Sequence, residues 1–123
     1  MFSALAAIAI AVGSWLHVPG GTWQPSTSVV AEARSHLATY AKQQASSKGL
    51  ALRTWSSYTF QYQGHTLPKS GRRVVYVNAF CTPPPSYAAQ EFVRITDGGA
   101  CYFEAYYDPA SKRFIGIAFH GLA

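Results

Sequence analysis

The chain has 123 residues, of which 49% are hydrophobic, 15% aromatic and 12% charged. This length suits one domain with one core and is too short for two, and the hydrophobic content excludes a disordered tail. Ten Lys and Arg residues against five Asp and Glu residues give a formal net charge of +5. That charge favours contact with anionic surfaces but does not distinguish phospholipid, cell-wall polymer and nucleic acid.

An apolar segment opens the chain. Phe2 to Val18 reads FSALAAIAIAVGSWLHV, and no charged side chain occurs before Glu32. A membrane-spanning helix needs about 20 apolar residues, whereas a secretory signal needs about 7–15 followed by a small-x-small site. We expect residues 1–18 to be an export signal or a membrane anchor and residues 19–27 to be a linker. A buried N-terminal helix of a soluble protein is the alternative.

One amphipathic helix is predicted at the start of a single domain that spans residues 28–123. Ser28 suits the N-cap, and Gly49 suits a left-handed cap at the other end. Between them, apolar residues recur at every fourth position, namely Val29, Ala33, Leu37, Ala41 and Ala45. A single apolar stripe of this kind predicts a helix that buries one face.

The rest of the chain has the pattern of strands. Predicted strands cover residues 52–62, 73–81, 91–96, 100–107 and 114–119, and residues 97–99 and 108–112 are predicted turns. Three consecutive prolines exclude residues 82–86 from a central strand. The result is an α+β fold in which one helix packs on a curved, four- to five-stranded antiparallel sheet. Its outline resembles cystatin-like and NTF2-like domains, and an outline alone does not indicate a function.

The second half of the chain carries three distinctive strings, VVYVNAFC, DGGACYFEAYYDP and FIGIAFHGLA. Over roughly residues 55–123, this pattern resembles a family of small exported bacterial proteins of uncharacterised function. Members of that family have a strand ending in Asn-Ala-Phe-Cys, a Gly-Gly-x-Cys hairpin and a last strand ending in Asn-Gly-x-Ala. His120 stands here where that Asn is usual. The resemblance implies an extracytoplasmic α+β domain and no particular activity.

The chain has two cysteines, Cys81 and Cys101, both in predicted strands. An even number of cysteines in an exported chain favours a disulfide. In a strict up-and-down meander, however, the predicted strand 91–96 would place the two at opposite ends of the sheet, too far apart to bond. Either residues 82–90 run back across the sheet and the disulfide forms, or both thiols stay free.

No catalytic residue, metal site or cofactor is predicted. The four histidines are far apart in the sequence, and there is neither an HxxxH nor a CxxC motif. A nucleophilic pair of Cys81 with His65 or His120 would lack a recognisable oxyanion loop. Glu104 lies inside a predicted strand, so we expect it to form an ion pair with Arg73 or Arg94 rather than to act as a catalytic acid.

One sheet face is the candidate binding surface. If the two cysteines lie on one face, then alternation places five polar and aromatic residues on the other, with three arginines near the rim. The residues are Tyr76, Asn78, Tyr102, Glu104 and Tyr106, with Arg72, Arg73 and Arg94. Such a face could stack sugar rings or bases, or hold a peptide. The alternative is that the helix packs on this face and that these residues form the core.

These observations favour an extracytoplasmic binding or interaction module without catalytic activity that is secreted, periplasmic or membrane-anchored. The expected partner is an unknown protein or an anionic cell-surface component, and Phe2 to Val18 could add a membrane contact. The alternatives are a basic domain that binds an anionic polymer or, less favoured, nucleic acid, and an enzyme whose site the sequence does not reveal.

Overall fold

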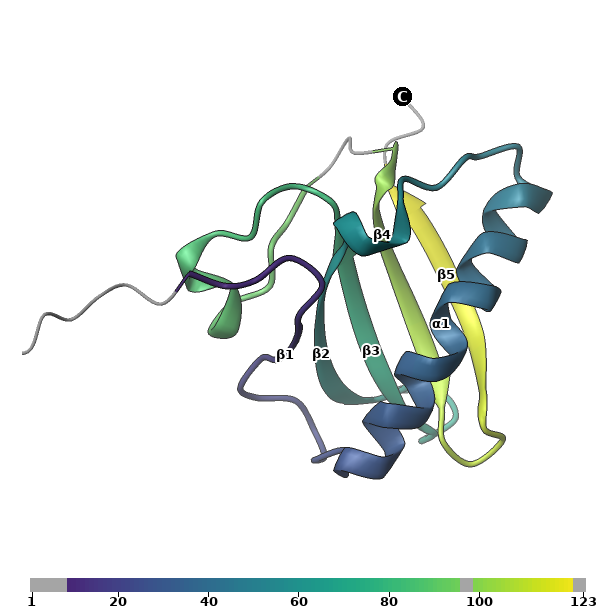
Figure 1. The fold of residues 1–123 in the computed structure, drawn as a ribbon. Coiled ribbons are helices and arrows are strands. Elements are labelled where there is room, and N and C mark those ends of the chain that lie inside the picture. The colour runs from purple at the N-terminus through teal and green to yellow at the C-terminus, as the bar shows by residue number, and fades with distance from the viewer. Residues whose placement is uncertain (1–8, 96–98, 121–123) are drawn as a thin grey trace, which may run out of the picture.

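The computed structural model of the chain describes residues 9–95 and 99–120 and has one helix packed on a five-stranded sheet (Figure 1). The elements are β1 (Trp15–His17), α1 (Thr27–Ser47), η1 (Trp55–Ser57), β2 (Thr59–Thr66), β3 (Arg73–Phe80), η2 (Ser86–Ala89), β4 (Gly99–Asp108) and β5 (Arg113–His120). The strands lie in the order β1-β2-β3-β4-β5, and β1 alone is parallel to its neighbour. The predicted α+β fold is confirmed, but the sheet is mixed rather than antiparallel.

The apolar stripe of α1 is the one predicted from the sequence. Ala33, Leu37, Ala41 and Ala45 are buried, and three of them are small enough to let the helix approach the sheet closely. The helix begins slightly earlier than predicted, because the side chain of Ser26 accepts a hydrogen bond of 3.2 Å from the Val29 N–H. Gly49 follows the helix with φ +68°, as predicted for a left-handed cap.

A short strand upstream of the helix was not predicted. β1 pairs with β2, and the ring of Trp15 stacks on Phe60 with 4.7 Å between centroids. Val18 is buried as well, so the folded unit includes the end of the apolar segment. The assignment of Phe2 to Val18 as a signal or anchor remains a prediction, and residues 2–8 of this segment lie outside the described residues. Within residues 9–95 and 99–120, no helix is long and apolar enough to cross a membrane.

Gly64 explains why the segment around Trp23 lies against the sheet. A Cβ atom at position 64 would lie 2.1 Å from the Trp23 carbonyl oxygen, so only glycine admits this backbone contact. The indole Nε1 of Trp23 then donates to the carbonyls of His65 and Val74 at 2.9 and 3.1 Å. Gly64 lies beyond the predicted strand 52–62, but it pairs with Val75 inside β2.

The order of strands corrects the prediction for residues 91–96. Glu91 to Ile95 form no strand, and Thr96 lies outside the described residues. β4 instead pairs directly with β3, with Phe80 opposite Tyr102. The predicted turn at 97–99 lies outside the described residues except for Gly99, which begins β4. The turn at 108–112 is confirmed, because the Asp108 carboxylate accepts hydrogen bonds from its own turn.

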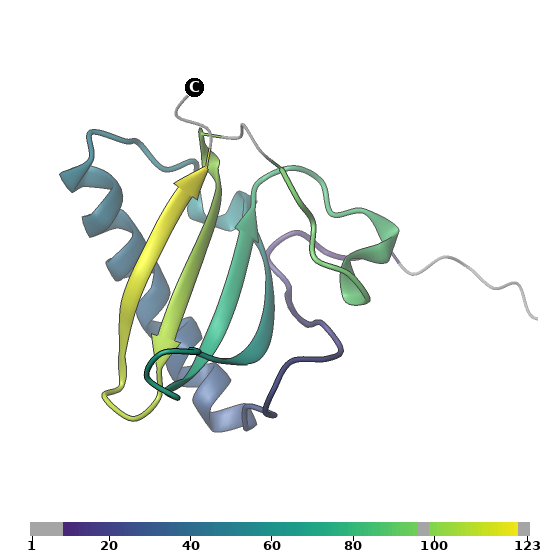
Figure 2. The ribbon, with the colours of Figure 1, turned by 180° about the vertical axis from the view of Figure 1, so that it is seen from behind.

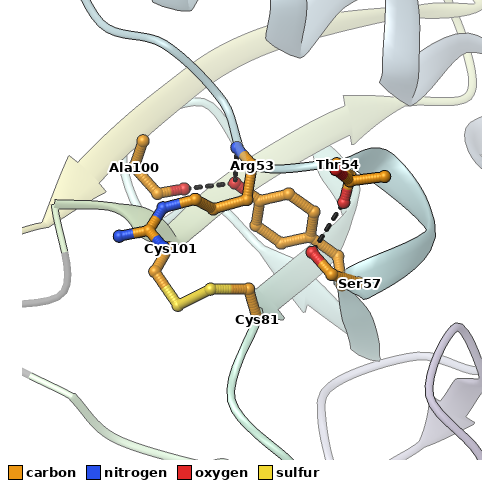
Figure 3. The surroundings of a disulfide bond; sticks show 7 residues. Arg53, Thr54, Ser57, Cys81, Ala100 and Cys101 are labelled. Atoms are coloured by element: carbon orange, nitrogen blue, oxygen red, sulfur yellow. Dashed lines mark hydrogen bonds between the residues drawn. A yellow bond between two sulfur atoms is a disulfide. The ribbon is translucent and has the colours of Figure 1, made fainter.

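Direct pairing of β3 with β4 brings the two cysteines together. Cys81 and Cys101 form a disulfide with their Cα atoms 5.0 Å apart (Figure 3), and the Cys81 N–H donates to the Cys101 carbonyl at 2.9 Å. The predicted disulfide is confirmed, because no strand intervenes between the two cysteine-bearing segments. The bridge faces α1 at one end of the core and closes the connection between β3 and β4.

Removing the disulfide with the double substitution Cys81→Ala and Cys101→Ala should lower the free energy of unfolding by about 3 kcal/mol, because a loop of this length no longer restricts the unfolded chain. Urea denaturation measures the change. Wild-type protein in a thiol reductant should lose a similar amount. Equal stability of the double variant and the oxidised wild type would contradict the assignment.

Candidate functional site

The sheet face opposite α1 carries the five strand residues predicted for a binding surface. In the register of β3 and β4, Asn78 lies opposite Glu104 and Tyr76 opposite Tyr106, while the residues that alternate with them belong to the helix-side core. Seen from behind, α1 lies beyond the sheet (Figure 2). These residues therefore share the sheet face away from the cysteines, as predicted. The role of that face in binding remains a prediction.

The connection from β3 to β4 covers part of this face. Ala88 and Val93 of the connection pack against Phe80 and Tyr102 of the strands, and all four are buried. Asn78 and Tyr102 consequently belong to the interior, as the alternative reading of the sequence held for them. The element that covers them is the connection, residues 81–95, rather than α1.

Two buried amide side chains, Gln61 of β2 and Asn78 of β3, hold the connection on the sheet, and we call them the amide clamp. The Gln61 Nε2 donates to the carbonyls of Ala88 and Glu91, each at 2.7 Å. Its Oε1 accepts from the Val93 N–H and from the Asn78 Nδ2, each at 2.9 Å. Both amides are fully buried. Because buried polar groups are costly unless they are bonded, the clamp fixes one path for the connection.

Val93 is the residue on which the clamp converges. Its carbonyl accepts from the Asn78 Nδ2 at 3.0 Å and from the Tyr102 hydroxyl at 2.5 Å. The backbone of this segment is therefore satisfied by side chains of the sheet rather than by a neighbouring strand. These bonds explain why a segment with a strand-like sequence does not form a strand.

The clamp places Phe92 and Arg94 beside the uncovered part of the sheet. We call this uncovered part the open face. It consists of the buried Tyr76 and the six exposed or partly exposed residues around it: His65, Glu104, Tyr106, His120, Phe92 and Arg94.

Glu104 is the polar centre of the open face. One carboxylate oxygen accepts from the Tyr76 hydroxyl and lies 3.6 Å from the Arg94 guanidinium, and the other lies 2.8 Å from the His120 Nε2. The expected ion pair with Arg94 is confirmed. The carboxylate side chain is only 17% exposed, whereas Arg94 and His120 are 67% and 33% exposed. A ligand in solution can therefore reach the side chains of Arg94 and His120 more easily than the Glu104 carboxylate.

Aromatic rings surround this centre. Tyr76 stacks on His65 with 4.7 Å between centroids and meets Phe92 edge to face at 5.1 Å and Tyr106 at 5.6 Å. Burial, together with the hydrogen bond and the charge of Glu104, raises the pKa of Tyr76 far above its usual value. Burial and the Arg94 charge lower the pKa of His65, so its imidazole is neutral at neutral pH. Tyr76 is itself buried and bonded to Glu104, and the His65 Nε2 lies 2.8 Å from the Gln63 Oε1, so these two neutral groups hold the centre in place.

Beside Tyr106 the open face continues into a shallow hollow of about 220 Å³, whose other lining residues are Leu67, Ile115 and Gly116. The lining is mostly apolar. A Cβ atom on Gly116 would lie 3.7 Å from the Tyr106 ring, an ordinary contact, so the glycine leaves one side of that ring uncovered. The hollow supplies the surface of the Tyr106 ring, and the Glu104 centre supplies polar groups beside it.

Two of the predicted rim arginines do not join the open face. Arg72 pairs with Asp108 at 3.3 Å, and Arg73 lies over the Trp23 ring at 5.9 Å from its centroid. Burial opposes ionisation of Asp108, but hydrogen bonds from Ser111 and the Ala110 N–H, together with the Arg72 charge, lower its pKa below the usual value. These contacts are structural, so the rim of the open face carries Arg94 alone of the three predicted arginines.

Four residues on this side of the sheet were not predicted to lie there, namely Gln61, His65, Phe92 and His120. The alternation of Gln61, Gln63 and His65 with two aromatic residues was a usable signal for the β2 residues. For Phe92 there was no such signal, because its position depends on the amide clamp. The considered Cys–His pair is excluded, since Cys81 is oxidised and faces α1.

Known proteins do not settle what the open face binds. No known protein family, curated protein or solved structure matches the chain. Within residues 9–95 and 99–120, no group of three or more His, Cys, Asp and Glu side chains could hold a metal ion. The chemistry of the site itself is therefore the basis for the proposed function.

Replacing Gln61 with Leu should lower the free energy of unfolding by about 2–4 kcal/mol, because the Val93 N–H and the Asn78 amide lose their buried acceptor. Urea denaturation gives the change, and limited proteolysis should cut the connection faster. Gln90→Leu, at an exposed position of the same connection, is the matched control. Similar stabilities of the two variants would show that the clamp does not hold the connection.

Replacing Tyr76 with Phe should make stability less sensitive to alkali. The unfolded tyrosine ionises near pH 10, while the folded one does so only at higher pH, so the wild type loses stability as the pH rises above about 10. Between about pH 10 and 11, the variant should lose about 1 kcal/mol less than the wild type in urea denaturation. Tyr87→Phe, at an exposed tyrosine, should follow the wild type. Parallel pH curves for Tyr76→Phe and the wild type would refute the assignment.

Proposed function

We propose that the protein is a noncatalytic extracytoplasmic binding module and that its open face binds a glycan of the cell surface. The observation that carries the proposal is the Glu104 centre, in which a carboxylate, a hydroxyl, a guanidinium and an imidazole converge beside the partly exposed rings of Phe92 and Tyr106. A sugar offers both an apolar CH face, which packs on aromatic rings, and hydroxyl groups, which need donors and acceptors close by.

Charge supports a neutral or weakly charged ligand at this place. Arg94 and Glu104 offset one another, so the open face itself lacks the excess of positive charge that a polyanion requires. An extended peptide segment of a protein also needs both polar and apolar contacts. If no glycan binds, the result would therefore point to a protein partner.

Export is supported by two independent features. The disulfide between Cys81 and Cys101 is stable in oxidising compartments and rare in the cytosol. The apolar segment from Phe2 to Val18 has the composition of an export signal or anchor. Fractionation of the native protein with intact-mass measurement tests both, through the mass of the N-terminus and the loss of two hydrogens from the thiols.

A glycan array probed with the full chain tests the ligand class. Replacing Tyr106 with Ala should weaken binding about tenfold or more, because it removes the ring beside the hollow. Arg94→Gln should weaken it as well, while Tyr87→Ala, at an exposed tyrosine outside the open face, should leave it unchanged. Glycan binding that survives both open-face substitutions would refute the site. No glycan binding would refute the ligand class.

The Glu104–His120 pair favours one second candidate, an enzyme in which His120 acts as a general base. A carboxylate 2.8 Å from one ring nitrogen orients an imidazole for proton transfer. The discriminating test is to incubate the protein with any glycan that it binds and to follow new products by mass spectrometry. Turnover that disappears in His120→Ala but not in Tyr87→Ala would identify an enzyme.

A further inference from the structure

A second recess, of about 310 Å³, lies on the other side of the molecule, between α1 and the beginning of β5. Its lining includes His36, Tyr40 and Gln43 from the helix and Lys112, Arg113 and Phe114 from the strand and its preceding turn. In Figure 1, α1 runs alongside β5, on the side of the sheet opposite the open face. We call this recess the helix–strand cleft.

Aromatic rings form one wall of the cleft. Tyr40 stacks on Phe114 with 5.4 Å between centroids and 23° between planes. One turn earlier on the helix, His36 lies nearly parallel to the Tyr107 ring at 6.3 Å. Residues 36, 40 and 43 face the same way because they are four and three positions apart in a helix. A flat apolar group could therefore lie along this wall.

The mouth of the cleft is positively charged. Within the described part of the chain, neither Lys112 nor Arg113 forms an ion pair, whereas Arg72 and Arg94 both do. The carboxylate of Glu32, one turn before His36, accepts a hydrogen bond from the Tyr107 hydroxyl at 3.2 Å. Two adjacent cations without a carboxylate partner beside an aromatic wall indicate a place for an anionic ligand.

The backbone at Lys112 gives a way to test the lysine without disturbing the fold. Its φ of 56° lies in the left-handed region, and it is the only non-glycine residue with positive φ among the described residues. Glycine would adopt this conformation without the steric cost that a side chain adds. The chain thus keeps a lysine side chain at the mouth of the cleft where glycine would fit the backbone better.

We propose that the helix–strand cleft binds a small aromatic anion, with its ring on the Tyr40–Phe114 wall and its carboxylate or phosphate group at Arg113 and Lys112. A guanidinium matches the two oxygens of either group, and an ammonium adds a compact charge. The volume of the cleft is at the lower end of the range for small-molecule sites and suits a small ligand. This site is separate from the open face and does not depend on its function.

Titration calorimetry with phenyl phosphate, benzoate, inorganic phosphate and neutral benzyl alcohol tests the proposal on the full chain. At least one of the two aromatic anions should bind about tenfold more tightly than both inorganic phosphate, which lacks the ring, and benzyl alcohol, which lacks the charge. The better of the two probes identifies the anionic group. Equal affinity for benzyl alcohol, or no measurable binding of either aromatic anion, would overturn the proposal.

Three variants separate a site from general attraction to a basic protein. Arg113→Gln should weaken the better probe about tenfold, and Lys112→Gly should weaken it about threefold or more. Lys112→Gly should not lower the midpoint of thermal unfolding, because glycine relieves the left-handed backbone, so loss of binding cannot be attributed to unfolding. Arg53→Gln removes the same charge at an exposed position outside the cleft and should bind like the wild type.

Equal weakening by Arg113→Gln and Arg53→Gln, with a steep dependence on salt, would overturn the cleft proposal in favour of an anionic polymer bound over a wider surface. The result is independent of the open face, because Tyr106→Ala should leave affinity for the aromatic anions unchanged. Failure of the glycan proposal and failure of the cleft proposal are therefore distinguishable.

Discussion

The architecture of this protein depends on two buried amide side chains. Gln61 and Asn78 satisfy backbone groups of a connection that has no strand beside it, and in return the connection shields them from water. An unbonded group at this depth would cost about 1–3 kcal/mol, so these bonds select one path among the many that a long connection could take. The disulfide closes the same connection at its base, next to β3 and β4. Together they determine which part of the sheet is covered.

The uncovered part of the sheet inherits its chemistry from this arrangement. Arg94 reaches Glu104 only because the neighbouring Val93 is held by the amide clamp, and Phe92 meets Tyr76 for the same reason. Stability and the composition of the open face are thus coupled, since a change that releases the connection also removes two residues from that face. The helix–strand cleft lies on the opposite side and is built from α1 and the turn before β5, so it is independent of the clamp.

Features with a regular period could be predicted from the sequence. The stripe of Ala33, Leu37 and Ala41 predicted the buried face of the helix, and alternation around Val75 and Glu104 predicted which residues share a sheet face. β1 was missed because three residues at the end of an apolar run show no period. The segment 91–96 was wrongly expected to be a strand, because side-chain amides take the backbone bonds that its sequence would otherwise offer to a neighbour. Phe92 could not be placed for the same reason, whereas Arg94 was predicted near the rim of the face.

Hydrogen exchange at the Val93 amide tests the role of the clamp most directly. This N–H belongs to no strand, and its partner is the side chain of Gln61. If the clamp holds the connection on the sheet, the Val93 amide should exchange about as slowly as that of Val77 in the centre of β3. Exchange at the rate of an unprotected amide, while Val77 stays protected, would show that the connection lies loosely on the sheet and that the open face has no fixed boundary.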